Sequence, residues 1–265
     1  MIYCIWYPSG GFGHFVNSVL NLHGENFVRP KTKLIFSSNG NSHALDYVAP
    51  SYIKNQNFYN FNFDPLRNYS VIVDNGINNE ETKFVDFFPG ATVIKLCYSD
   101  YSWPIVANTM LTKAVGTDLE SHLSSEAEWE STEPWAQREK YFLYLRDHPL
   151  RYAWKPSNIS KNLFIETIMS YTDFANEIES FGIQLEDFEE LHQTWQQSNY
   201  RYCQPVVSAE KFINGEELAD PITDLWTQAV VYYQIWCKYG VEVPHNDFAD
   251  FFTSYQQFQD WISSI

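Results

Sequence analysis

Residues 2–14 read IYCIWYPSGGFGH, an apolar run rich in β-forming residues that passes into a turn with three glycines. Beyond it, the apolar residues of Phe15–Leu22 recur at helical spacing until Gly24 interrupts them. Because strands favour such apolar runs and sharp turns favour glycine, this order predicts a strand at Ile2–Tyr7, a glycine turn and then a helix.

Three further apolar runs follow, and each ends in a polar turn. They are Lys33–Ser37, Tyr69–Asp74 and Ala91–Tyr98. Helical patterns are expected after them at 43–48, at 80–88 and from about Trp103 to Val115. Continuous apolar strands separated by helices are typical of a parallel sheet covered on both faces. We therefore expect a three-layer α/β fold, with its ligands beyond the carboxyl ends of the strands, where all these turns would lie.

The chain changes character at about residue 117. Residues 117–140 are strongly acidic and predict a solvated excursion or lid, whereas residues 141–265 are mainly helical in pattern. Stripes of apolar and aromatic residues at helical spacing are expected to form core in this part, at 171–181, 185–195, 225–236 and 248–261. No linker separates the halves, so we expect one domain over residues 1–265, with 1–116 as its α/β core.

The composition narrows the classes of function. The 265 residues include 33 acidic and 17 basic side chains, for a formal net charge of −16, and so acidic a surface repels nucleic acid. No apolar run approaches the ~18 residues of a membrane span and no leader pattern is present, so we expect a cytoplasmic protein. The four cysteines stand far apart, which predicts reduced, buried thiols and no disulfide framework.

The glycine turn carries the strongest chemical signal. Closely spaced glycines let the backbone approach a ligand, and the helix behind them presents unpaired N–H groups at its positive end. Such a turn holds a phosphate or sulfate group without a metal ion. The residues expected to bind are Pro8, Ser9, Gly10, Gly11, Phe12, Gly13, His14 and Phe15. Ser9 would add a hydroxyl donor, and His14 is the expected catalytic base. The alternative is a turn that needs glycine only for packing.

A second anion contact is expected after the last of these apolar runs. Ser99, Asp100 and Ser102 precede the helix predicted from Trp103, and Pro104 falls in its first turn. One of the three is expected to cap the helix. All three are candidate ligands, and the alternative is a cap without a ligand.

Other ionisable residues could also serve such a site. His43 and Asp74 are weaker candidates for the base, and Asp74 is equally well explained as the cap of the turn that follows it. The cations available to an anion site are Arg29, Lys31, Lys33, Arg67 and Lys95. No two of the seven histidines have metal-ligand spacing, so no metal is implied.

The order of these parts resembles the sulfotransferases that use 3′-phosphoadenosine 5′-phosphosulfate (PAPS). In that family the first strand enters a Pro-x-Ser-Gly type of loop, matched here by Tyr7–Gly11, which holds the 5′-phosphosulfate. A later strand and helix bind the 3′-phosphate, and Val93–Asn108 stands at that place. Asn162–Glu166 and Tyr171–Gly182 look like a further region of the family. The resemblance implies a P-loop fold, PAPS as the donor, and a hydroxyl of a carbohydrate or small metabolite as the acceptor.

Two other classes of function stay open. The run Gly10–His14 after a strand also resembles the glycine loop of nucleotide-sugar glycosyltransferases. The loop lacks the basic residue of the sulfotransferase family, and Tyr98 and Val106 stand near that family's arginine and serine positions. A catalytically degenerate binding module on the same fold is therefore the third hypothesis.

Overall fold

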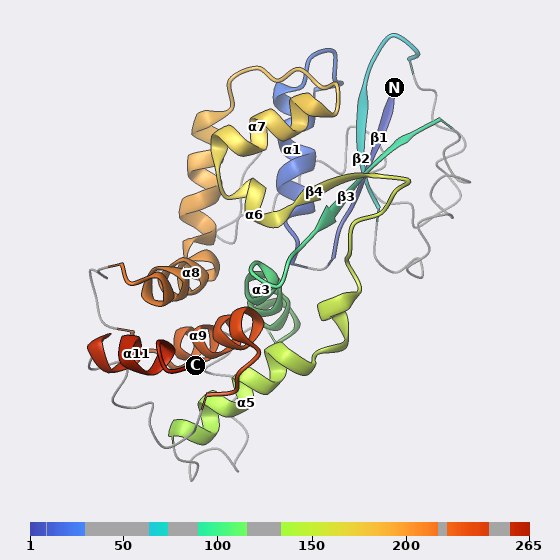
Figure 1. Cartoon of the computed structure of the whole chain (residues 1–265). Helices are drawn as coiled ribbons and strands as arrows, with labels where there is room; N and C mark the ends of the chain where they lie inside the picture. The colour runs from blue at the N-terminus through green and yellow to red at the C-terminus, as the bar shows by residue number, and fades with distance from the viewer. Residues whose placement is uncertain (9, 30–63, 74–89, 116–133, 217–221, 244–254) are drawn as a thin grey trace. The chain divides into compact units, whose positions relative to one another are not determined.

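The computed structural model describes residues 1–8, 10–29, 64–73, 90–115, 134–216, 222–243 and 255–265 (Figure 1). The chain divides into two compact units. The first comprises Met1–Ser99 and Trp154–Tyr200, and the second comprises Asp100–Ala153 and Arg201–Ile265. The expected elements at 33–37, 43–48 and 80–88 lie outside the described residues, as do Ser9, His43, Asp74 and residues 117–133.

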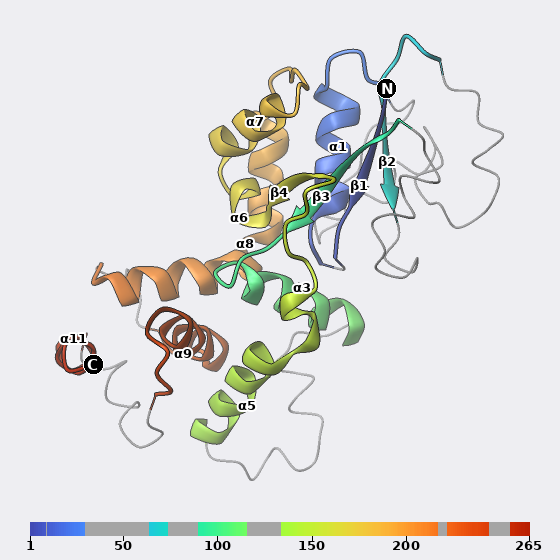
Figure 2. The same cartoon turned by 45° about the vertical axis from the view of Figure 1, so that its right-hand side comes forward.

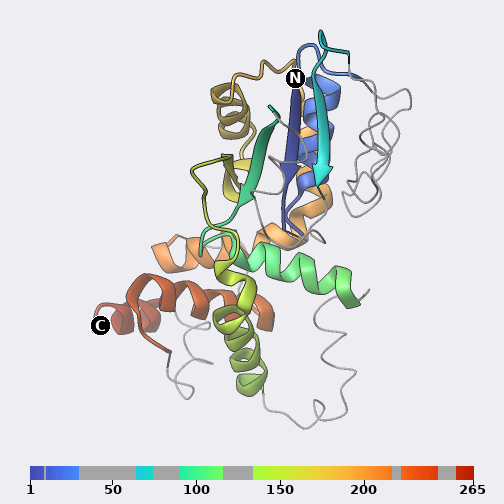
Figure 3. The same cartoon turned by 90° about the vertical axis from the view of Figure 1, so that its right-hand side faces the viewer.

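The first unit contains a parallel sheet. Its described strands are β1 (Ile2–Trp6), β2 (Tyr69–Val73), β3 (Thr92–Cys97) and β4 (Lys161–Phe164), in the order β2-β1-β3-β4. All neighbours pair in parallel, and the arrows of β1, β2 and β3 run the same way in Figure 3. Three of these strands were predicted. β4 was not, because it is four residues long and lies in the part of the chain with helical patterns.

One face of the sheet packs on helices of the same unit. These are α1 (Gly13–His23), α6 (Ile165–Ile168), α7 (Tyr171–Ser180) and the first part of α8 (Glu189–Asn214) (Figure 2). Ile5 and Leu96 from the strands form one apolar cluster with Phe15, Phe174 and Trp195 from the helices. The helical spacing of the apolar residues from Phe15 onward therefore identified the core face of α1 correctly.

The opposite face of the sheet is buried as well. Cys4 and Cys97 are fully buried there, and the ring of Trp6 lies 4.9 Å from that of Trp154. Burial on both faces explains why these strands read as continuous apolar runs. The predicted fold class, an α/β fold with a central parallel sheet and a helical C-terminal half, is confirmed.

The second unit is helical. Its described elements are α3 (Trp103–Val115), α5 (Pro134–Asp147), the 3₁₀ helix η3 (Pro149–Tyr152), the remainder of α8, α9 (Leu225–Tyr239) and α11 (Tyr255–Ile262). α5 packs against α9, which begins at a cap in which Asp224 Oδ1 accepts the Thr227 N–H at 2.7 Å. Among the described residues, no helix is both long and apolar enough to cross a membrane.

The cysteines agree with the prediction in one respect and differ in another. No disulfide joins the four, all of which are described, and Cys4 and Cys97 are buried as expected. Cys237 is exposed, contrary to the expectation of buried thiols, because it lies near the C-terminal end of α9, beyond the buried residues Tyr233 and Ile235.

Candidate functional site

The glycine turn joins β1 to α1 at the carboxyl edge of the sheet. Pro8 O accepts the Gly11 N–H at 2.8 Å, which closes the turn. Gly10 has a φ of 83°, in the left-handed region that favours glycine. A Cβ on Gly11 would lie 2.8 Å from the Pro8 ring, and one on Gly13 would lie 2.1 Å from the Tyr7 ring. The backbone geometry therefore requires glycine at these positions.

The cap position of α1 is occupied by Phe12, which has a φ of 60° and whose side chain makes no capping hydrogen bond. Its carbonyl accepts the Phe15 N–H at 2.9 Å, and its ring lies edge-on to Trp195 at 5.2 Å. A non-glycine residue in the left-handed region is strained, and strain of this kind gathers at functional sites. The positive end of α1 thus lies directly behind a strained turn.

His14 starts a polar stripe along the buried face of α1. It is 7% exposed and lies 5.8 Å from the Tyr7 ring, measured between ring centroids. One turn further, the fully buried Asn17 accepts the Ser70 hydroxyl of β2 at 2.6 Å through Oδ1. Its Nδ2 has no hydrogen-bond partner among the described residues. Polar side chains therefore continue from the glycine turn into the space between α1 and β2.

Phe15, the last predicted residue of the turn, belongs to the apolar core. It is 1% exposed, and its ring stacks on Trp195 at 4.8 Å. It anchors the start of α1 in the core, and in the turn before it Gly10, Gly11 and Gly13 are buried while Phe12 is half-buried.

The three residues predicted for the second anion contact fall in different units. Ser99 is the last residue of the segment Met1–Ser99 of the first unit, whereas Asp100 and Ser102 belong to the second unit. α3 begins at Trp103 as predicted, and the buried Ser102 lies directly before it. The Asp100 carboxylate accepts from Nε of Arg151 at 3.1 Å and lies 3.0 Å from its Nη2. The structure therefore shows Asp100 as the partner of an arginine.

Among the described members of the predicted cation set, Lys95 lies in β3 beside the end of β1, with its side chain on the face of the sheet opposite to α1. It pairs with Trp6, the last residue of β1, and it is 6% exposed. Its Nζ lies 4.9 Å from the Trp6 ring centroid. The other two described cations are engaged elsewhere, Arg67 with the Phe27 carbonyl at 3.0 Å and Arg29 with Glu186 at 2.5 Å.

Glu166 is a candidate that was not predicted as a site residue. It is the second residue of α6, two residues after the end of β4, and its Oε2 is buried without a hydrogen-bond partner among the described residues. Since Phe164 pairs with Cys97 in β3, Glu166 extends from the same carboxyl edge of the sheet as the glycine turn. Recognising β4 in the sequence would have identified it.

The groups that lie toward the carboxyl ends of these strands are of two kinds. Backbone N–H groups and the ammonium of Lys95 are able to bind an anion, and the side chains of His14 and Glu166 are able to accept a proton. In the described part of the chain, no group of three or more histidine, cysteine or acidic residues is placed to hold a metal ion.

No protein-family model, no curated protein and no solved structure matches this chain.

Proposed function

We propose that the glycine turn binds the anionic part of an activated donor and that the protein transfers a sulfuryl group from PAPS to a hydroxyl of a carbohydrate or small metabolite. The observation that carries this proposal is the N-terminus of α1. Its cap residue Phe12 makes no side-chain cap bond, and Gly10 and Phe12 before it are both left-handed, at the end of a strand inside a parallel sheet.

The glycines of the turn have no room for side chains. At Gly11 and Gly13 even one added methyl carbon would collide with Pro8 or Tyr7, so only glycine allows the backbone to take this course into α1. Hydrogen bonds from such a backbone suit the tetrahedral oxygens of phosphate and sulfate.

The residues of this edge can each be given a role in the transfer. The N–H groups of the turn other than that of Gly11, which bonds to Pro8 O, and the ammonium of Lys95 stabilise the charge that gathers on the sulfuryl and phosphate oxygens. His14 takes the proton of the acceptor hydroxyl as that oxygen bonds to sulfur. The bond from sulfur to the 5′-phosphate oxygen breaks, and adenosine 3′,5′-bisphosphate leaves with the electron pair.

The test is an assay of bisphosphate release from PAPS by the full chain, with glucose, N-acetylglucosamine and lactose as acceptors. We expect release that depends on an acceptor. His14→Asn should lower kcat by about 10²–10⁴-fold and leave binding of the bisphosphate unchanged, because a general base acts in the chemical step. The proposal fails if PAPS is neither bound nor consumed.

A further inference from the structure

The second unit contains a cavity of its own. Its volume is about 300 Å³, at the small end of the range of ligand pockets. The lining residues that bear on its chemistry are Asp100, Glu210, Asn214, Gln234, Cys237 and Lys238. All of them belong to the second unit, so the cavity is separate from the glycine turn.

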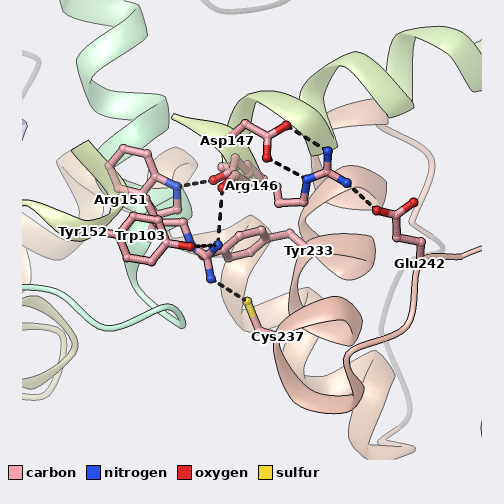
Figure 4. Close-up of polar contacts among 9 residues, drawn as sticks. Trp103, Arg146, Asp147, Arg151, Tyr152, Tyr233, Cys237 and Glu242 are labelled. Carbon is pink, nitrogen blue, oxygen red and sulfur yellow. Dashed lines mark hydrogen bonds and ion pairs between the residues drawn. The ribbon is translucent and has the colours of Figure 1, made fainter. Parts of the chain in front are cut away.

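The wall of the cavity is held by a buried arginine. Arg151 is 5% exposed, contacts Asp100 at 3.0 Å and donates to Cys237 Sγ at 3.7 Å. Figure 4 shows its guanidinium between Tyr152, Tyr233 and Cys237, and its Cζ lies 4.5 Å from the ring centroid of Trp236. A planar cation that is stacked and bonded on several sides keeps these groups in place.

The charges at the cavity balance. The carboxylate of Asp100 is opposed by Arg151, and the carboxylate of Glu210 shares the cavity with the ammonium of Lys238. The sum is zero, although the whole chain carries −16. A site without net charge gives no preference to an anion or a cation, which favours a neutral ligand.

The cavity offers hydrogen-bond donors and acceptors side by side. The Glu210 carboxylate accepts a hydrogen bond from the Tyr101 hydroxyl at 2.7 Å and has further lone pairs with which to accept another. Lys238 Nζ lies 3.5 Å from Oδ1 of Asn214. Gln234 is 9% exposed, and its Nε2 has no hydrogen-bond partner among the described residues. A buried amide donor without an acceptor is destabilising, and turning it toward a ligand oxygen in the cavity would relieve this.

We infer that this cavity binds a small neutral molecule with several hydroxyl groups, of the size of one sugar ring. Each hydroxyl both donates and accepts, so it matches carboxylate oxygens and amide N–H groups that lie next to one another. Ile213 supplies an apolar contact for the carbon side of such a ring.

Cys237 provides a direct readout of occupancy. It lines the cavity and is exposed, whereas Cys4 and Cys97 are buried. Burial raises the pKa of both Cys203 and Cys237, but at Cys237 hydrogen bonds from Tyr233 and Arg151 act in the other direction. Alkylation of the full chain by iodoacetamide should therefore occur first at Cys237, and mass spectrometry of the peptides measures its rate. The probes are glucose, N-acetylglucosamine and myo-inositol, with putrescine and inorganic sulfate as charged controls.

The expected result is that at least one neutral probe slows alkylation of Cys237, about tenfold at ten times its Kd, since only the free protein reacts. Gln234→Leu should abolish this protection, measured as the ratio of that variant's own rates with and without probe. Gln193→Leu, an exposed glutamine of the first unit, should keep the protection.

Two results with the probes would overturn the inference. In the first, none of the three neutral probes slows the alkylation of Cys237. In the second, only putrescine or sulfate slows it. Circular dichroism of the Gln234→Leu variant shows whether a loss of protection comes from the cavity or from unfolding. Full protection in a folded Gln234→Leu variant would also count against the assignment.

Discussion

Lys95 and Trp6 face each other across the β1–β3 pair, with Nζ of Lys95 4.9 Å from the ring centroid of Trp6. The lysine is almost fully buried, and Trp6 is the last residue before the glycine turn. The face of an aromatic ring attracts a cation, which offsets part of the cost of burying this ammonium. In the proposed function, Lys95 is the described cation that favours the bound anion.

Replacing this cation should weaken anion binding selectively. We expect Lys95→Met to lower the affinity for adenosine 3′,5′-bisphosphate by about tenfold or more, because a charge-assisted contact contributes about 1.5–3 kcal/mol. Isothermal titration measures the affinity. The matched control is Lys161→Met, at the exposed first residue of β4, which should bind as the wild type does. Equal weakening in both variants would point to a general effect of charge.

The turn itself should not tolerate a side chain. In Gly11→Val, the Cβ would lie within 3 Å of Pro8, so the turn must open and its N–H groups lose their arrangement. We expect binding of the bisphosphate to disappear and the free energy of unfolding to fall by about 1–3 kcal/mol.

A second glycine variant controls for the general effect of such changes. Gly182 has a φ of 85° and open space around its Cβ position, and it lies after α7. Gly182→Ala should lose about 1 kcal/mol of stability through backbone strain and keep full binding. Retained binding in Gly11→Val would remove the turn from the site.

Arg151 should be a main determinant of the stability of the second unit. Arg151→Met removes its bonds to Asp100 and Tyr233 and leaves their oxygens with fewer donors. Since the Asp100 side chain is 44% exposed, water replaces part of what is lost, and we expect a destabilisation of about 2–3 kcal/mol. Urea unfolding measures it. Asp100→Asn, which keeps an acceptor for the arginine, should lose less, and the opposite ranking would contradict this account.

Stability should fall in mild acid because of buried histidine. Burial lowers the pKa of His192 below its ordinary value of 6.5, although its bond to the Ile168 carbonyl acts in the other direction. As the pH falls, His192 therefore takes up a proton in the unfolded chain before it does so in the folded chain. Its contribution to the free energy of unfolding is fully present well above pH 6.5 and declines as the pH falls through and below that value. Urea unfolding at pH 7 and pH 5 should show a smaller decline in His192→Gln than in the wild type. An identical decline would exclude His192 as a contributor.

Those parts of the fold that depend on local pattern could be predicted from the sequence. β1, the glycine turn and α1 follow one another in a single short stretch, and α3 begins at Trp103 behind a serine and before a proline. Long apolar runs and helical spacing are properties of neighbouring residues, so they can be recognised without knowledge of the tertiary structure.

The parts that depend on distant partners could not be predicted. β4 is a strand because Lys161–Phe164 pairs with β3, and its own four residues carry too little pattern to show this. Arg151 sits in an ordinary Pro-Leu-Arg-Tyr segment, and its significance comes from Asp100, Tyr233 and Cys237, which are 51, 82 and 86 residues away. Asp100, predicted as a ligand, is the partner of that arginine for the same reason.

The measurement that bears most directly on the anion site is a calorimetric titration of the full chain with adenosine 3′,5′-bisphosphate, with ADP and UDP as competitors. The proposed function predicts one site per chain and an affinity for the bisphosphate at least about tenfold higher than for either competitor, a difference of about 1.4 kcal/mol. Tighter binding of UDP would favour a nucleotide-sugar glycosyltransferase. If none of the three nucleotides gave a heat of binding, the hypothesis of a catalytically degenerate binding module would remain. Either result would contradict the assignment of the turn to PAPS.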